Sequence, residues 1–156
     1  MKPPPRSGVG QPTLRSRALA HLARREHTRA ELARRLAPFA ESAAEVEVLL
    51  DELAARKLLS DARYAEARVA TLARKFGAAR IAQELRARGV SGPDAEQALA
   101  GARASELERA RAAWAKRFGV APADALERAR QMRFLASRGF AFDVIRAVVG
   151  GRGDDE

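Results

Sequence analysis

The chain has 156 residues, enough for one or two compact domains or a short array of repeats. Hydrophobic residues make up 47% of it but aromatic residues only 5%, so the composition favours several thin helix–helix contacts over one thick core. With 29 Lys and Arg against 20 Asp and Glu, the formal charge is +9, which favours an anionic partner such as nucleic acid or an acidic protein surface. The absence of cysteine excludes disulfides, thiolate nucleophiles and most structural zinc sites.

Residues 1–13 predict a disordered basic tail, because they contain three consecutive prolines and two glycines and show no helical pattern. No apolar segment follows the basic start, so no secretory signal is predicted. No apolar run approaches the roughly 20 residues that a transmembrane helix needs. We therefore expect a cytoplasmic protein that does not enter a membrane.

Apolar residues in helical register begin at Leu14 and predict a first helix through Leu22. The next two helices are separated by Pro38. Each of them opens with a capping box, a hydroxyl residue followed three positions later by glutamate: Thr28 with Glu31, and Ser42 with Glu45. The three helices together predict a first repeat over residues 14–57.

A second repeat of three helices is predicted over residues 58–102. Ser60 is the candidate N-cap of its first helix. Gly77 allows the turn into the second helix, and Gly89 is a left-handed stop at the end of that helix. The third helix is predicted to end at Gly101.

A third repeat is predicted over residues 103–150, followed by an acidic tail at residues 151–156. Gly119 breaks the first helix of this repeat, and Pro122 suits the first position of the second. Gly139 ends that second helix, and a short apolar helix closes the repeat.

The repeats are supported by the spacing of the leucine that precedes each turn. Leu36, Leu85 and Leu135 lie 49 and 50 positions apart. RARGV follows the second of these leucines and ASRGF the third, so glycine and an apolar residue recur at the same offsets. The prediction is an all-α fold, a tandem array of three three-helix repeats, whose elongated form suits the binding of an extended partner.

No set of residues predicts catalysis, a metal site or a cofactor. His21 and His27 are six positions apart, too far to present two metal ligands on one helix face. An acidic cluster is better explained as a solvated helix face than as a metal or acid–base site. Its members are Glu45, Glu47, Asp51 and Glu52. Because no glycine-rich phosphate loop occurs either, we predict that the protein is not an enzyme.

The basic residues predict a binding surface instead. The alternative for each is an exposed helix face with partners at i,i+3 or i,i+4, as in Glu127–Arg130 and Glu84–Arg88. The candidates for contact with a partner protein or DNA are Arg24, Arg25, Arg74, Lys75, Arg80, Arg86, Arg88, Lys116, Arg117, Arg130, Arg133 and Arg138. Trp114 is predicted to lie in the core rather than to stack on a base, because Leu107 and Phe118 share its apolar stripe.

Three parts of the chain carry a family resemblance. They are LARREHTRAELARRL (Leu22–Leu36), LLSDARYAEARV (Leu58–Val69) with FGAARIAQELRARGV (Phe76–Val90), and FLASRGFAFDVIRAVV (Phe134–Val149). In this order and spacing they resemble the RecX family, bacterial regulators of the RecA recombinase. The resemblance runs over residues 14–149.

The resemblance implies a curved, all-helical protein that binds along the groove of RecA–single-stranded DNA filaments. Such a protein limits filament growth and inhibits ATP hydrolysis and strand exchange, which places it in homologous recombination, DNA repair and the SOS response. The family supplies no catalytic residue and no cofactor to carry over. We expect a monomer with the RecA nucleoprotein filament as its partner.

Two other functions stay open at this point. The first is a stand-alone, helix-turn-helix-like module that contacts single- or double-stranded DNA directly. The spread of positive charge over three repeats, rather than over one recognition helix, argues against it. The second, a hydrolase that uses the acidic cluster, is the least favoured.

Overall fold

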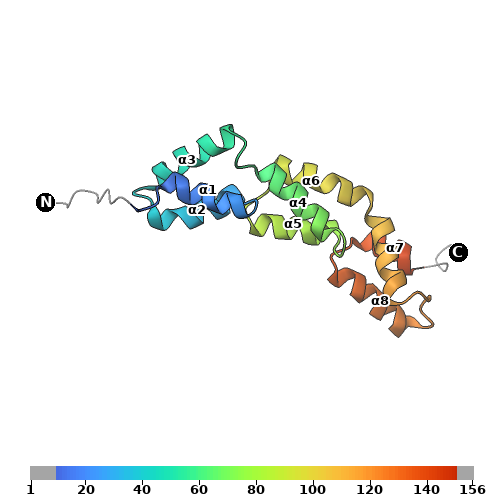
Figure 1. Ribbon diagram of the computed structural model, residues 1–156. Helices are drawn as coiled ribbons and strands as arrows, with labels where there is room; N and C mark the ends of the chain where they lie inside the picture. The colour runs from blue at the N-terminus through green and yellow to red at the C-terminus, as the bar shows by residue number, and fades with distance from the viewer. Residues whose placement is uncertain (1–9, 151–156) are drawn as a thin grey trace. The chain divides into compact units, whose positions relative to one another are not determined.

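The computed structural model describes residues 10–150. Within this range every regular element is helical, which confirms the predicted all-α class. The chain divides after Asp61 into two compact units (Figure 1). Of the predicted tails, residues 1–9 and the acidic residues 151–156 lie outside the described range.

The first unit contains three α-helices and one short 3-10 helix. They are α1 (Leu14–Arg24), α2 (Arg29–Leu36), η1 (Ala37–Phe39) and α3 (Ala43–Ala55). A leucine-rich core lies between them, in which Leu32, Leu36 and Leu50 are fully buried. These leucines recur at helical spacing on α2 and α3, so one face of each helix is removed from water and the opposite face stays polar.

Both predicted N-caps of the first unit are present. The Thr28 hydroxyl accepts a hydrogen bond from the Glu31 N–H at 3.0 Å, and the Ser42 hydroxyl accepts one from the Glu45 N–H at 3.2 Å. Both glutamate carboxylates also contact other residues. Glu31 pairs with Arg25 at 3.0 Å, and the Glu45 carboxylate accepts from the N–H of Glu41.

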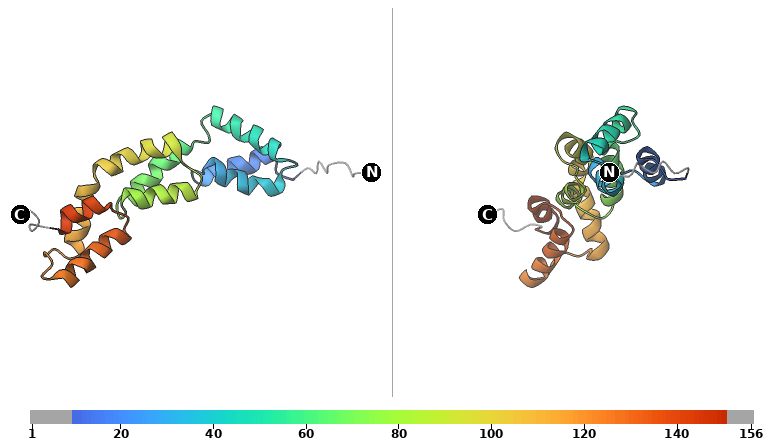
Figure 2. Two further views of the ribbon diagram at one scale, coloured as in Figure 1. Left: turned by 180° about the vertical axis from the view of Figure 1, so that it is seen from behind. Right: turned by 90° about the vertical axis from the view of Figure 1, so that its left-hand side faces the viewer.

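The second unit contains six helices. They are α4 (Asp61–Leu72), α5 (Ala78–Ala87), α6 (Gly92–Ala104), α7 (Glu106–Arg117), α8 (Ala125–Ser137) and α9 (Phe142–Val149). One core is shared by α4, α5 and α6. A second lies where α9 packs against α7 and α8 (Figure 2). The unit is thus built from two successive three-helix groups, as the repeat spacing predicts.

Gly89 and Gly139 end their helices in the same way. Both have positive φ, and each carries the paired bonds of a Schellman motif. The N–H groups of Val90 and Phe140 donate to the carbonyls of the repeat leucines Leu85 and Leu135, at 2.9 and 3.3 Å. Since both apolar residues after the glycines are buried, the recurring glycine and apolar pair is explained by one cap geometry.

Two predicted helix ends are wrong. The helix predicted to end at Gly101 continues to Ala104, because Ala102 is buried and one more helical turn keeps it in the core. Pro122 precedes α8 rather than starting it. The cap of α8 is Asp124, whose carboxylate accepts a hydrogen bond from the Glu127 N–H at 2.8 Å. A side-chain acceptor at this position decides where the helix begins.

The two three-helix groups of the second unit join at the N-terminus of α5. The Gly77 N–H donates to the carbonyl of Arg138 at 2.8 Å, and the Ala78 N–H donates to the buried Glu106 carboxylate at 2.8 Å. Gly77 and Gly139 pass so close that a Cβ on Gly77 would lie 2.3 Å from the Gly139 carbonyl oxygen. Neither position has space for a side chain, so both glycines are needed for this approach.

Alanine at Gly77 should separate the two groups. We expect Gly77→Ala to lower the free energy of unfolding of the second unit by about 2 kcal/mol or more, because the contacts on the new Cβ are backbone atoms. Denaturant unfolding followed by Trp114 fluorescence measures this, since Trp114 lies in the second unit. Gly101→Ala is the matched control, because a Cβ there meets open space, and a gain of roughly 0.5–1 kcal/mol is expected. Equal effects at Gly77 and Gly101 would contradict the close approach.

A buried histidine makes the first unit sensitive to pH. His27 is buried, and its Nδ1 donates to the Arg25 carbonyl at 3.0 Å. Burial lowers the pKa of His27 more than this hydrogen bond raises it. Burial, with Arg35, Arg24 and Arg25, also lowers the pKa of His21, whose ring lies 5.7 Å from that of His27. Both imidazoles are therefore favoured in their neutral forms by folding.

The unfolded chain should take up protons first as the pH falls through about 6.5, so the first unit loses stability from there down to the folded-state pKa values. Urea midpoints read from the NMR resonances of α1–α3 at several pH values measure the loss. His27→Gln should flatten part of this dependence, whatever it does to stability at neutral pH. A slope unchanged in the variant would show that another group is responsible.

Candidate binding site

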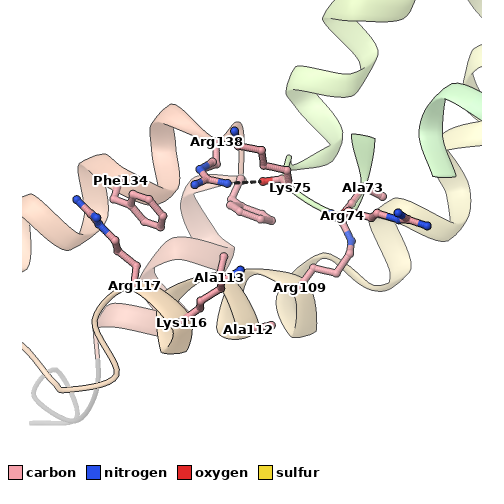
Figure 3. A pocket seen from close by; sticks show the side chains of 11 residues that line it. Ala73, Arg74, Lys75, Arg109, Ala112, Ala113, Lys116, Arg117, Phe134 and Arg138 are labelled. Atoms are coloured by element: carbon pink, nitrogen blue, oxygen red, sulfur yellow. Dashed lines mark hydrogen bonds between the residues drawn. The ribbon is translucent and has the colours of Figure 1, made fainter. Parts of the chain in front are cut away.

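A hollow of about 700 Å³ lies within the second unit, beside the junction of its two helix groups (Figure 3). Its basic lining residues are Arg74, Lys75, Arg109, Lys116, Arg117 and Arg138. No acidic residue lines it, although the second unit contains many. So many cations without a counter-charge make the hollow a site of strongly positive potential.

The shape of the hollow follows from helix spacing. On α7, residues 109, 112, 113, 116 and 117 recur at three- and four-residue intervals and so share one face. Ala112 and Ala113 lie between the basic residues of this face, and their short side chains leave the space that forms the hollow. The turn after α4 contributes Arg74 and Lys75, and the end of α8 contributes Arg138.

Arg109 is the structural member of this basic set. Its guanidinium donates to the carbonyls of Ala73 at 2.9 Å, Phe76 at 2.6 Å and Ala102 at 2.7 Å. It thereby ties α7 to the ends of α4 and α6. Burial lowers the pKa of Arg109, but a guanidinium remains protonated in proteins. Its charge contributes to the hollow while its N–H groups are occupied by carbonyls.

Phe134 orders two other cations of the hollow. The guanidinium of Arg138 lies 4.9 Å from the centre of its ring, and that of Arg117 lies 5.7 Å away. Phe118 packs edge-on against the same ring at 5.4 Å. Arg138 also donates to the Lys75 carbonyl at 3.4 Å, across the junction (Figure 3). Stacking on an aromatic face limits the freedom of both arginines before any ligand arrives.

Five of the predicted contact residues meet at this hollow: Arg74, Lys75, Lys116, Arg117 and Arg138. Sequence reasoning proposed them as separate groups, because positions 75 and 138 are adjacent only in the fold. Arg80 lies outside the hollow. It donates to the Ser137 carbonyl at 2.8 Å and stacks on Phe76 at 4.3 Å, so it supports the junction.

The remaining predicted residues are dispersed. Arg88 pairs with Glu84 at 4.0 Å and Arg130 with Glu127 at 3.7 Å, the helix-face pairs considered from the sequence. Arg25 pairs with Glu31 in the first unit. Three others are exposed on their helices and line no part of the hollow: Arg24, Arg86 and Arg133.

The acidic cluster of the first unit has arginine partners. Glu47 and Asp51 both accept from Arg29, at 2.6 and 2.7 Å, and Glu52 accepts from Arg15. Within residues 10–150 no group of three or more His, Asp or Glu side chains is placed to hold a metal ion. In the same range no helix is both long and apolar enough to cross a membrane.

Trp114 packs in the core, as predicted, and its ring nitrogen donates to the Gln131 side chain at 2.8 Å. Gln131 is itself buried and donates to the Val120 carbonyl at 3.1 Å. This amide links α7, α8 and the loop between them. Sequence reasoning missed Gln131, because its buried position shows only when Leu135, four residues later, is recognised as part of the same core-facing stripe.

These features define a class of protein: an all-helical chain of tandem three-helix domains with a cationic hollow in its second unit. Family models agree with this description. The model for the second three-helix domain of RecX matches residues 60–99, and the model for the third matches residues 104–149.

Relatives cover nearly the whole chain. The chain is 55% identical to the regulatory protein RecX of Leptothrix cholodnii, over 89% of this chain and 88% of the relative. It is 51% identical to that of Chromobacterium violaceum, over 92% and 93%. The crystal structure of RecX from Lactobacillus salivarius superposes with a TM-score of 0.75 at 22% identity, over 88% of this chain and 92% of that chain, and supports the fold. The chain belongs to the RecX family.

Arg109 should matter for stability through its geometry rather than its charge. We expect Arg109→Lys to lower the free energy of unfolding of the second unit by roughly 1–3 kcal/mol, because an ammonium group cannot span three carbonyls and leaves some of them unpaired. Arg111→Lys on the exposed face of the same helix is the control, and should change stability by less than about 0.5 kcal/mol. Trp114 fluorescence in denaturant compares the two variants. Similar values for both would rule out the proposed role of the guanidinium fork.

Proposed function

We propose that this chain regulates the RecA recombinase by binding RecA–single-stranded DNA filaments, and that its main effect is inhibitory. Bound protein limits filament extension, ATP hydrolysis and strand exchange. It acts in the cytoplasm as a monomer, in homologous recombination and DNA repair, including the SOS response. The observation that carries the proposal is the match to proteins named regulatory protein RecX over about nine tenths of the chain.

The cationic hollow supports binding to a nucleoprotein filament. DNA phosphates and acidic protein side chains are both anionic, and basic residues from two helix groups converge on one place. A partner bound in the hollow contacts the turn after α4 together with α7 and α8. A protein that holds several filament components at once resists the subunit motions of ATP turnover without chemistry of its own. No catalytic residue is needed for this effect.

A stand-alone nucleic-acid-binding module is the second candidate, and the absence of acidic residues around the hollow favours it. The two functions differ in the protein concentration at which RecA ATP hydrolysis is inhibited. A filament regulator inhibits DNA-dependent ATP hydrolysis by RecA at concentrations well below those that coat naked single-stranded DNA. A competitor for the DNA lattice inhibits only where naked DNA is already saturated. Titration of ATP hydrolysis on preformed filaments, beside direct DNA binding, separates the two.

Charge reversal in the hollow should weaken the regulation. We expect Lys116→Glu with Arg117→Glu to raise the concentration for half-inhibition of RecA ATP hydrolysis by about tenfold or more, because two attractive contacts become repulsive. The control is Arg111→Glu with Arg128→Glu, which makes the same change of charge on exposed positions of α7 and α8 away from the hollow. Circular dichroism checks that both variants keep their helices. If both doubles lose inhibition equally, net charge rather than the hollow determines binding.

A further inference from the structure

The hollow combines a basic rim with an apolar floor. Ala73, Ala112, Ala113, Phe134 and Phe140 contribute apolar surface between the basic side chains. A row of phosphates binds to exposed cations without any hollow. A recess with an apolar floor therefore fits a ligand that has a flat apolar part beside its negative charge.

The size of the hollow narrows the class of ligand. Its volume of about 700 Å³ falls in the range of roughly 300–1,000 Å³ that is typical of sites for small organic ligands. One amino-acid side chain of a docked protein would fill only a small part of it. One or two nucleotides have the right bulk, and each supplies a planar base and one phosphodiester charge.

The cations at the rim are suited to phosphodiester groups. Arg74, Lys75, Lys116 and Arg117 are exposed, and Arg138 is half-buried. Because Arg117 and Arg138 already lie against Phe134, little side-chain freedom remains for them to lose when their outer N–H edges meet phosphate oxygens. Arg109, fixed by three backbone carbonyls, adds positive potential at the floor.

We propose that this hollow is a nucleotide-binding site for single-stranded nucleic acid, in which a base lies on the alanine and phenylalanine floor and its flanking phosphates lie on the rim. The inference deepens the proposed function and rests on it for the presence of single-stranded DNA in the target. Duplex DNA is disfavoured, since its bases are paired and stacked and enter a recess only after flipping out. An acidic peptide matches the rim but not the floor.

Two exposed alanines of α7 provide the test. Ala112 lines the hollow, whereas Ala115 does not. Ala112→Glu and Ala115→Glu replace the same residue type on the same helix and change the net charge by the same amount. Only Ala112→Glu places a carboxylate among the basic side chains of the hollow. The full chain is titrated into a fluorescently labelled short oligothymidylate, an abasic strand of the same length, and a labelled polyglutamate peptide, with anisotropy as the readout.

We expect Ala112→Glu to weaken oligothymidylate binding about tenfold and Ala115→Glu less than about threefold, because salt screens the repulsion between an exposed carboxylate and a phosphate unless the two are close together. We expect the abasic strand to bind the unchanged protein about tenfold more weakly, through loss of base stacking. Ala112→Gln adds the same bulk at the same position without the charge. The difference between Ala112→Glu and Ala112→Gln therefore measures the effect of the carboxylate apart from the loss of space. Circular dichroism confirms that the variants are folded.

Equal losses in Ala112→Glu and Ala115→Glu would overturn the site, and equal binding of abasic and thymidylate strands would overturn the role of the floor. Tighter binding of polyglutamate than of oligothymidylate would assign the hollow to an acidic protein partner instead. RecA ATP hydrolysis is measured separately with the same proteins. If the unchanged chain fails to inhibit RecA while the Ala112-selective loss persists, the proposed function is wrong and the nucleotide site stands.

Discussion

The backbone contact between Gly77 and Gly139 is the constraint on which the second unit depends. Two chain segments that are more than sixty positions apart meet there without an intervening side chain, and a hydrogen bond from Gly77 to the Arg138 carbonyl fixes their register. The Glu106 carboxylate completes the arrangement by capping the first N–H of α5. A negative charge at a helix N-terminus is stabilising, so one buried acid serves both three-helix groups.

The cationic hollow is a consequence of this junction. With the turn after α4 held against the end of α8, Lys75 and Arg138 become neighbours, and α7 adds the basic face that carries Lys116. Arg109 occupies the centre of the arrangement, where its bonds to three carbonyls satisfy the ends of α4 and α6. Arg109 thus stabilises the fold through its backbone partners, whereas the exposed Lys75 and Lys116 are available to a ligand.

A regulator that acts by binding needs a charged surface such as the cationic hollow rather than a set of catalytic residues. The described residues pair their acidic cluster with arginines in the first unit and concentrate unpaired positive charge in the second. Mutual repulsion among the basic side chains costs stability in the free protein, and an anionic ligand relieves it. Relief of this repulsion contributes to the binding free energy both in the proposed filament binding and at the proposed nucleotide site.

The sequence by itself determined the helical class, the repeat spacing, most helix ends and the core role of Trp114, because these depend on local periodicity and on caps within a few residues. It also supplied five of the hollow's six basic residues, but as separate groups. Only the tertiary structure decided that they converge, that Arg80 and Arg109 bind carbonyls, and that His21 and His27 lie together across a turn. These relations join residues that are distant in sequence or separated by a chain reversal, and no local pattern encodes them.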